Sequence, residues 1–269
     1  MVVPVELVSD TLWPNGYIGK KYLNTAIQKV LRHPLADAPR PLAFSVIRVP
    51  FFLEPNYDES KPFVESNRER LIKKWGGPAG WEEQKRRHNL KGRGQDAGIP
   101  HFNLDRLAAN SMASHRLIQH LGKNYGLNVS EAIYDKLNEY YFVEGHSLND
   151  KPLLAKTVAA ELSNILDSGS DSPSEEQLLK FLNGNEGRKE ILAAIEALHE
   201  LGVHGIPKFI IEGAHVVDGA ATSDVFVQLF RDIERRGEIE NGPIFGDILG
   251  VPSEIVQKGS HHAPAEMAA

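Results

Sequence analysis

The first fifty residues read as strand, helix and strand, and this order limits the folds that the chain can adopt. Residues 2–8 are apolar and rich in valine, as expected of a buried strand. Residues 17–32 repeat apolar side chains with the spacing of one helix face, and Pro34 ends the pattern. Residues 42–52 form a second β-rich run. This order predicts two strands joined by a right-handed helical crossover.

The middle of the chain, from residue 60 to residue 201, contains no comparable β-rich run. Apolar residues with helical spacing dominate it, and glycines such as Gly126 and Gly145 can end the helices. Residues 76–100 are rich in glycine and charge, so we expect them to form a long irregular loop near a cleft. The sequence therefore predicts a large helical block.

After this block the pattern returns to short strands. Residues 208–212 and 215–217 predict a hairpin, and residues 222–236 predict a final helix. The element order predicts an α/β fold: a thioredoxin-like core (β-α-β … β-β-α) with a large all-helical domain inserted between its halves. We expect the core in residues 1–58 and 202–236 and the insertion in residues 59–201. Residues 237–269 form a C-terminal extension that either wraps the body or reaches a partner subunit.

The composition restricts the chemistry. The chain has no cysteine, which excludes disulfides, thiolate nucleophiles and dithiol redox chemistry of its own. Its eleven histidines show no metal-binding spacing, so we expect no metal. The formal net charge of -6, with acids and bases interspersed, argues against a nucleic-acid or membrane surface. The first residues lack the basic region of a signal peptide, which favours a cytoplasmic location.

Several motifs resemble the DsbA-like thioredoxin superfamily. They resemble in particular the branch of FrnE-type oxidoreductases, 2-hydroxychromene-2-carboxylate isomerases and kappa-class glutathione transferases. The motifs are DTLWPNGYIGKK (10–21), NSMASHRLI (110–118), EYYFVEG (139–145) with LNDKPLL (148–154), and GVHGIPKFII (202–211). The FrnE-type pattern at the first motif is D-x-x-C-P-W-C-x-I-G-K. On this register Trp13 and Gly16 occupy the two cysteine positions, and Asn15 replaces tryptophan, so the redox dithiol is lost.

The resemblance also bears on whether this chain binds glutathione. The isomerases and kappa transferases carry a serine at the first cysteine position, whose hydroxyl activates the glutathione thiol, and a G-N-D-like element before the last helix. Here these positions hold Trp13 and Gly219-Ala220-Ala221. We therefore expect no cofactor, and we expect glutathione to bind more weakly than millimolar.

The resemblance implies a site where the first helix meets a turn with a cis X-Pro bond at Pro207. We assign catalytic roles to Trp13, Asn15 and His204: stacking on a planar ligand, polarising a carbonyl and acting as a base. His204 can equally be an exposed turn residue, and Tyr17 a core residue. The substrate-binding candidates are Trp13, Tyr17, His101, Phe102, Asn110, Ile206 and Pro207.

Three functions follow as hypotheses. The first is a cofactor-independent isomerase, cyclase or lyase that acts on a small aromatic or polyketide-like substrate of secondary metabolism. The second is a non-catalytic pseudo-oxidoreductase that binds a small molecule or a partner. The third is a glutathione-dependent isomerase or transferase. A small-molecule substrate is the expected partner, and a homodimer is left open.

Overall fold

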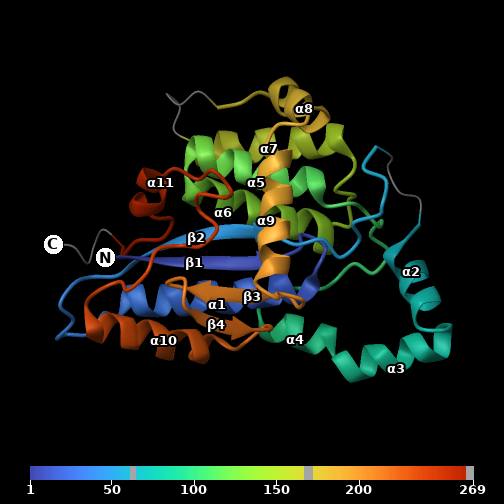
Figure 1. The fold of residues 1–269 in the computed structure, drawn as a ribbon. Coiled ribbons are helices and arrows are strands. Elements are labelled where there is room, and N and C mark those ends of the chain that lie inside the picture. Colours follow the sequence, from blue (N-terminus) through green and yellow to red (C-terminus); the bar gives the residue numbers. More distant parts are fainter. Residues whose placement is uncertain (61–64, 167–171, 265–269) are drawn as a thin grey trace.

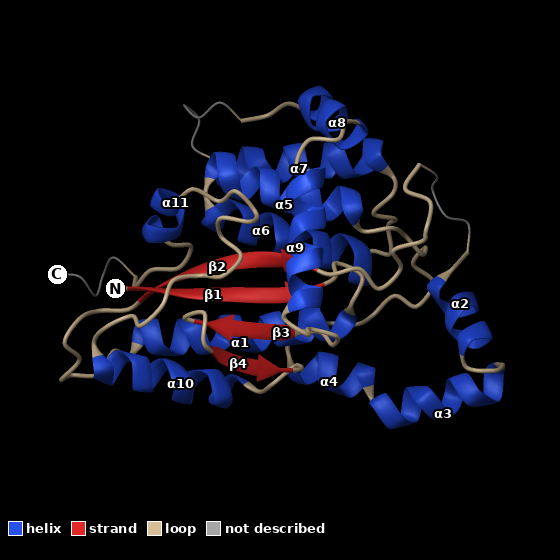
Figure 2. Cartoon of the chain, in the orientation of Figure 1, coloured by secondary structure: helices blue, strands red, loops and turns tan. Residues whose placement is uncertain are grey.

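The computed structural model describes residues 1–60, 65–166 and 172–264. Within these ranges, a four-stranded sheet has the order β2-β1-β3-β4 (Figures 1 and 2). β1 (Val2–Ser9) and β2 (Ala43–Pro50) are parallel, and α1 (Pro14–Arg32) connects them. β3 (Lys208–Ile211) runs antiparallel to β1, and β4 (His215–Asp218) runs antiparallel to β3. The predicted thioredoxin-like core is therefore present, and its halves join by pairing of β1 with β3.

Both faces of the sheet are covered, which explains the continuous apolar runs of β1 and β2. Side chains alternate between the faces, so Val5 and Leu7 pack against α1 and α10 (Ser223–Arg236). On the opposite face, Val8 and Ile47 pack with residues of α9 (Arg188–Glu200). Figure 1 shows α1 and α10 together on one side of the sheet.

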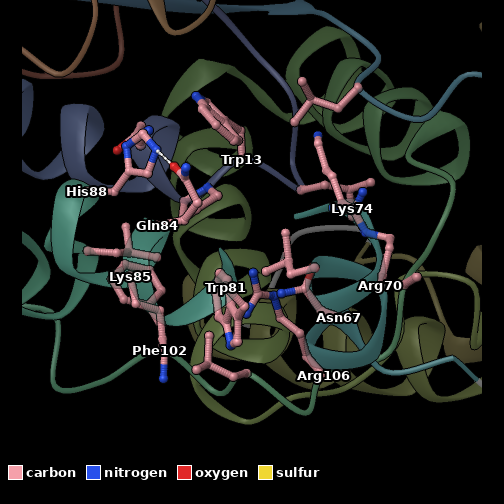
Figure 3. Close-up of a pocket in the computed structure, with 18 of the residues that line it drawn as sticks. Trp13, Asn67, Arg70, Lys74, Trp81, Gln84, Lys85, His88, Phe102 and Arg106 are labelled. Carbon is pink, nitrogen blue, oxygen red and sulfur yellow. Dashed lines mark hydrogen bonds between the residues drawn. The ribbon is translucent and has the colours of Figure 1, made fainter. Parts of the chain in front are cut away.

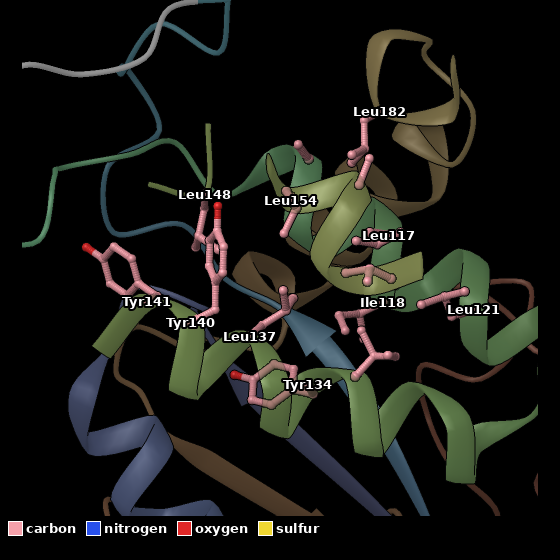
Figure 4. Packing of buried hydrophobic residues seen from close by; sticks show 14 of the residues in the cluster. Leu117, Ile118, Leu121, Tyr134, Leu137, Tyr140, Tyr141, Leu148, Leu154 and Leu182 are labelled. Carbon is pink, nitrogen blue, oxygen red and sulfur yellow. The ribbon is translucent and has the colours of Figure 1, made fainter. Parts of the chain in front are cut away.

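The helical block is built around a second large buried cluster. It contains α5 (Met112–Tyr125), α6 (Leu127–Asn138), α7 (Lys151–Ile165) and α8 (Glu175–Asn183). A π-helical turn, η1 (Glu139–Val143), continues α6. Leu117, Tyr134 and Leu154 belong to its buried cluster (Figure 4). Leu12, Tyr17 and Ile18 belong to the same cluster, so the block packs against the start of α1.

The prediction of an irregular loop over residues 76–100 is wrong. α2 (Asn67–Lys74), α3 (Pro78–His88) and α4 (Leu90–Asp96) form an arm that projects from the body (Figure 1). Pro78 begins α3, a position that favours proline. Asn89 is left-handed, with φ of 42°, and its side chain accepts a hydrogen bond from the Gly92 N–H at the start of α4. These local caps keep a glycine-rich stretch helical.

The C-terminal extension packs along the chain's own sheet as far as His261. Phe245, Leu249 and Val251 are buried in the cluster that also contains Val8 and Ile47. Beyond α11 (Ser253–Lys258), the Phe44 N–H donates to the His261 carbonyl at 2.9 Å. The last residues of the predicted extension, 265–269, lie outside the described residues.

Candidate functional site

The junction between β1 and α1 brings together two segments of the predicted site. Trp13 is the N-cap of α1 and Pro14 its first residue, so residues 14–16 form the first turn of the helix. The Trp13 indole Nε1–H donates to the Ile206 carbonyl at 3.0 Å. The Ile206–Pro207 peptide bond is cis. The Trp13 side chain therefore contacts the turn before β3 directly.

Gly16 fits here because the helix touches β1. A β-carbon added at Gly16 would lie 2.1 Å from the Ser9 Oγ, far inside van der Waals contact. Ser9 is buried, so its hydroxyl has little room to move. The structure thus leaves no space for a side chain at the position that the resemblance matches to the second cysteine.

A cavity of about 620 Å³ lies beside Trp13, between the start of α1 and the arm of α2–α4 (Figure 3). All three tryptophans of the chain line it: Trp13, Trp75 and Trp81. Phe102 and Tyr141 add further aromatic surface. Aromatic side chains offer flat apolar faces on which a planar ligand can stack.

The charged side chains in the wall of this cavity are predominantly basic. The basic side chains that line it are Arg70, Lys74, Lys85, Lys91, Arg93 and Arg106. Glu54 is the only carboxylate among the described lining residues, and it pairs with Arg70. Within the described ranges Lys74, Lys91 and Arg93 form no ion pair. The cavity therefore favours a ligand with negative charge.

Four of the predicted site residues line the cavity: Trp13, Asn15, His101 and Phe102. Asn15 is the second residue of α1, and its Oδ1 is buried without a hydrogen-bond partner in the described part of the chain. Its amide can therefore bond to a ligand without giving up an internal hydrogen bond at that oxygen.

Tyr17 and Asn110 do not line the cavity. The Tyr17 ring stacks on Phe142 with a centroid distance of 5.7 Å, and burial raises the pKa of Tyr17 to about 12. The Asn110 Nδ2 donates to the Tyr57 carbonyl at 2.8 Å, and its Oδ1 accepts from the Met112 N–H at 2.8 Å. The contacts of both side chains are with other residues of the chain.

His204, Ile206 and Pro207 also lie outside the set of lining residues. His204 is exposed and Pro207 is buried. Ile206 contributes its carbonyl to Trp13 and not to the cavity surface. The imidazoles that do line the cavity are His88, which shares a hydrogen bond of 3.1 Å with Gln84, and His101.

Most of the cavity residues on the arm, and Arg106 after it, were not predicted from the sequence. Trp81, His88, Asn67 and Arg106 all line the cavity (Figure 3). Two tryptophans close together in a charged, glycine-rich stretch were the available signal. Trp81 is buried to 9% exposure on a helix that is otherwise largely exposed, which marks a residue held by tertiary contacts.

The described residues lack two further features, a metal-binding cluster and a membrane-spanning helix. No group of three or more histidine, aspartate or glutamate side chains there is arranged to hold a metal ion. None of the helices in those ranges is long and apolar enough to cross a bilayer.

Comparison with known proteins identifies the fold. No protein-family model matches the sequence, and no curated protein sequence matches it. A probable DsbA oxidoreductase from Streptomyces coelicolor is similar in structure, with a TM-score of 0.68 and 24% identity over 90% of this chain and 93% of its own. A putative protein disulfide isomerase from Nitrosomonas europaea has a TM-score of 0.59 and 11% identity, over 88% of this chain and 100% of its own.

A third structure, a 2-hydroxychromene-2-carboxylate isomerase, aligns over 88% of this chain and 96% of its own, with 15% identity and a TM-score of 0.49. The structures from Streptomyces coelicolor and Nitrosomonas europaea each align over nearly their whole length. The chain has the DsbA-like thioredoxin fold and contains no cysteine.

Proposed function

We propose that this chain is a non-redox enzyme that isomerises, cyclises or cleaves a small aromatic substrate in the cavity beside Trp13. One observation carries the proposal: all three tryptophans, including the one at the first family cysteine position, line a single cavity of about 620 Å³. Pockets of a few hundred Å³ with aromatic walls and a few polar groups are typical of small-molecule sites. The position at the start of α1, next to the turn before β3, supports the same assignment.

The polar groups of the cavity define the chemistry. Asn15, at the positive end of α1, can polarise a carbonyl as negative charge develops on its oxygen. His88 and His101 can exchange protons with the substrate, because imidazoles act as acid or base near neutral pH. Positioning by the tryptophans and proton exchange by an imidazole suffice for an isomerisation or an elimination.

A panel of small aromatic ketones, lactones and hydroxy acids tests this proposal by absorbance and mass spectrometry. We expect turnover of at least one compound, and Asn15→Ala should lower that turnover by roughly ten- to a thousand-fold. Its thermal midpoint should stay close to the wild-type value, because the Asn15 Oδ1 has no hydrogen bond to lose. Leu71→Trp, which places bulk in the cavity, should abolish turnover, whereas Leu192→Trp on the exposed face of α9 should not.

The alternative is a non-catalytic binding protein. The hydrogen bond between the Trp13 indole and the Ile206 carbonyl favours it, because that bond occupies the one polar group of Trp13. Binding of panel compounds without turnover would support this function if Leu71→Trp abolishes the binding.

For the enzyme, full activity of Asn15→Ala would remove Asn15 from the mechanism.

A further inference from the structure

Two buried nitrogen donors at the wall of the cavity have no acceptor. The Arg106 Nε and the Asn67 Nδ2 each lack a hydrogen-bond partner among the described residues. Arg106 is 3% exposed and Asn67 is 4% exposed, and both line the cavity (Figure 3). The Asn67 backbone N–H donates to the Arg106 carbonyl at 2.8 Å, so the two residues are neighbours. Unsatisfied donors at one place indicate a missing acceptor.

The rest of the Arg106 guanidinium is held firmly. Its Nη1 donates to the Asn103 carbonyl at 2.7 Å. Its central carbon lies 5.1 Å from the ring centroids of both Tyr141 and Phe142. These contacts fix the guanidinium while the Nε remains unpaired.

No carboxylate balances the charge of Arg106 within the described chain. Glu54, the acid of the cavity wall, is paired with Arg70. A buried cation without an anion is strongly unfavourable unless a ligand supplies the missing charge. Arginine suits a carboxylate in particular, because its planar fork can donate two parallel hydrogen bonds.

We propose that the cavity binds the carboxylate of a small aromatic acid on Arg106 and Asn67. The ring system of the acid lies among Trp13, Trp81 and Phe102, which line the same cavity. Lys74, on the arm, adds positive charge at the wall. This inference rests on the proposed function for the place of binding, and it adds the substrate class.

Two probes with the same rings separate charge from stacking. 2-Naphthoate carries a carboxylate, and 2-naphthamide is its neutral counterpart. Calorimetry measures their affinities, and intrinsic fluorescence reports occupancy of the cavity because all three tryptophans line it. We expect the wild-type chain to bind 2-naphthoate at least about tenfold more tightly than 2-naphthamide, as charge-assisted hydrogen bonds should provide.

Arg106→Met should remove this preference and leave the affinity for 2-naphthamide within about threefold of wild type, since it keeps bulk and loses charge. Arg86→Met is the matched control: Arg86 is exposed on α3 outside the cavity, and the preference should persist. Thermal midpoints check the fold. Arg106→Met should lower the midpoint less than Arg116→Met does, because removal of an uncompensated charge offsets the loss of its bond to the Asn103 carbonyl. Arg116→Met should lower it, because the buried Arg116 donates to the Glu186 and Phe181 carbonyls.

Asn67→Leu removes the second donor and provides the same test should Arg106→Met fail to fold. A loss of preference of about threefold or more is expected. The inference is overturned if wild type binds both probes equally, or if both variants keep the full preference for 2-naphthoate. It is also overturned if neither probe binds. Equal binding of both probes leaves the proposed function standing, because that function is judged by the turnover panel.

Discussion

Gly16 shows how the packing around one residue can disfavour a cysteine at the start of α1. Its α-carbon lies so close to β1 that a β-carbon would meet the Ser9 Oγ at 2.1 Å and the Ser9 Cβ at 3.3 Å. A cysteine at this position would need more room than an alanine. The packing between β1 and α1 therefore disfavours a cysteine at residue 16.

Gly16→Ala should destabilise the chain by about 1–3 kcal/mol, the usual range for overpacking a buried site. In a Ser9→Ala background the hydroxyl is gone and only the 3.3 Å contact remains, so the same change should lower the free energy of unfolding by less than about 1 kcal/mol. Urea denaturation of the four proteins measures this double-mutant cycle. Equal penalties in both backgrounds would contradict the described packing.

At this scale the sequence predicted the site in part. Trp13 and Asn15 could be assigned to the site because the element order puts them at the start of the first helix. Both line the cavity. His204 could not be placed in this way, since its direction depends on the turn before β3, and the structure leaves it exposed outside the cavity. Arg106 and Asn67 were missed because burial of a polar side chain follows from tertiary contacts that a single sequence does not display.

Among the elements, the strands and the long helices were predictable and the arm was not. β1, α1 and β2 follow from apolar periodicity, which is strongest in long segments. α3 and α4 contain glycines that argue against a helix, and their caps at Pro78 and Asn89 outweigh that penalty. The C-terminal extension showed little pattern because it buries single residues such as Phe245 and not a periodic face.

Glu6 links this extension to the centre of the sheet. Its carboxylate accepts hydrogen bonds from the Ile244 N–H at 3.0 Å and the Phe245 N–H at 2.5 Å. Burial raises the pKa of Glu6 from 4.5 to about 7, although these two N–H groups act in the opposite direction. Between those values the folded chain holds a proton that the unfolded chain has released. The contribution of Glu6 to the free energy of unfolding therefore falls as pH rises from 4.5 to 7 and then levels off.

The size of this effect is about 3 kcal/mol, at 1.36 kcal/mol for each pKa unit. Glu6→Gln cannot titrate, so the difference in stability between wild type and variant should change by about this amount from pH 4.5 to pH 7.5. Urea denaturation at intervals across the range measures it. Glu131 does not interfere: burial raises its pKa, but Arg48 and Lys20 outweigh burial and lower it to about 2. A difference that is constant with pH would contradict the assignment.

For the whole molecule, a DsbA-like thioredoxin fold is combined with a chain that contains no cysteine. We expect the chain to reduce or oxidise disulfide substrates no faster than background, because it has no cysteine. Glutathione should bind more weakly than millimolar, that is, by less than about 4 kcal/mol. The Trp13 N–H already donates to Ile206, and alanines stand at positions 220 and 221 before α10. Calorimetry that gives micromolar affinity would restore a glutathione-dependent function.

The central claim is that the cavity beside Trp13 selects an aromatic acid. Equilibrium dialysis against a metabolite extract, followed by mass spectrometry, measures this directly for the wild-type chain and for Leu71→Trp, in which the cavity is filled. We expect wild type to enrich aromatic carboxylates more than about tenfold, the scale of a charge-assisted hydrogen bond, and we expect no enrichment by the variant. Retention of the same compounds by both proteins, or enrichment of neutral or thiol compounds alone, would contradict it.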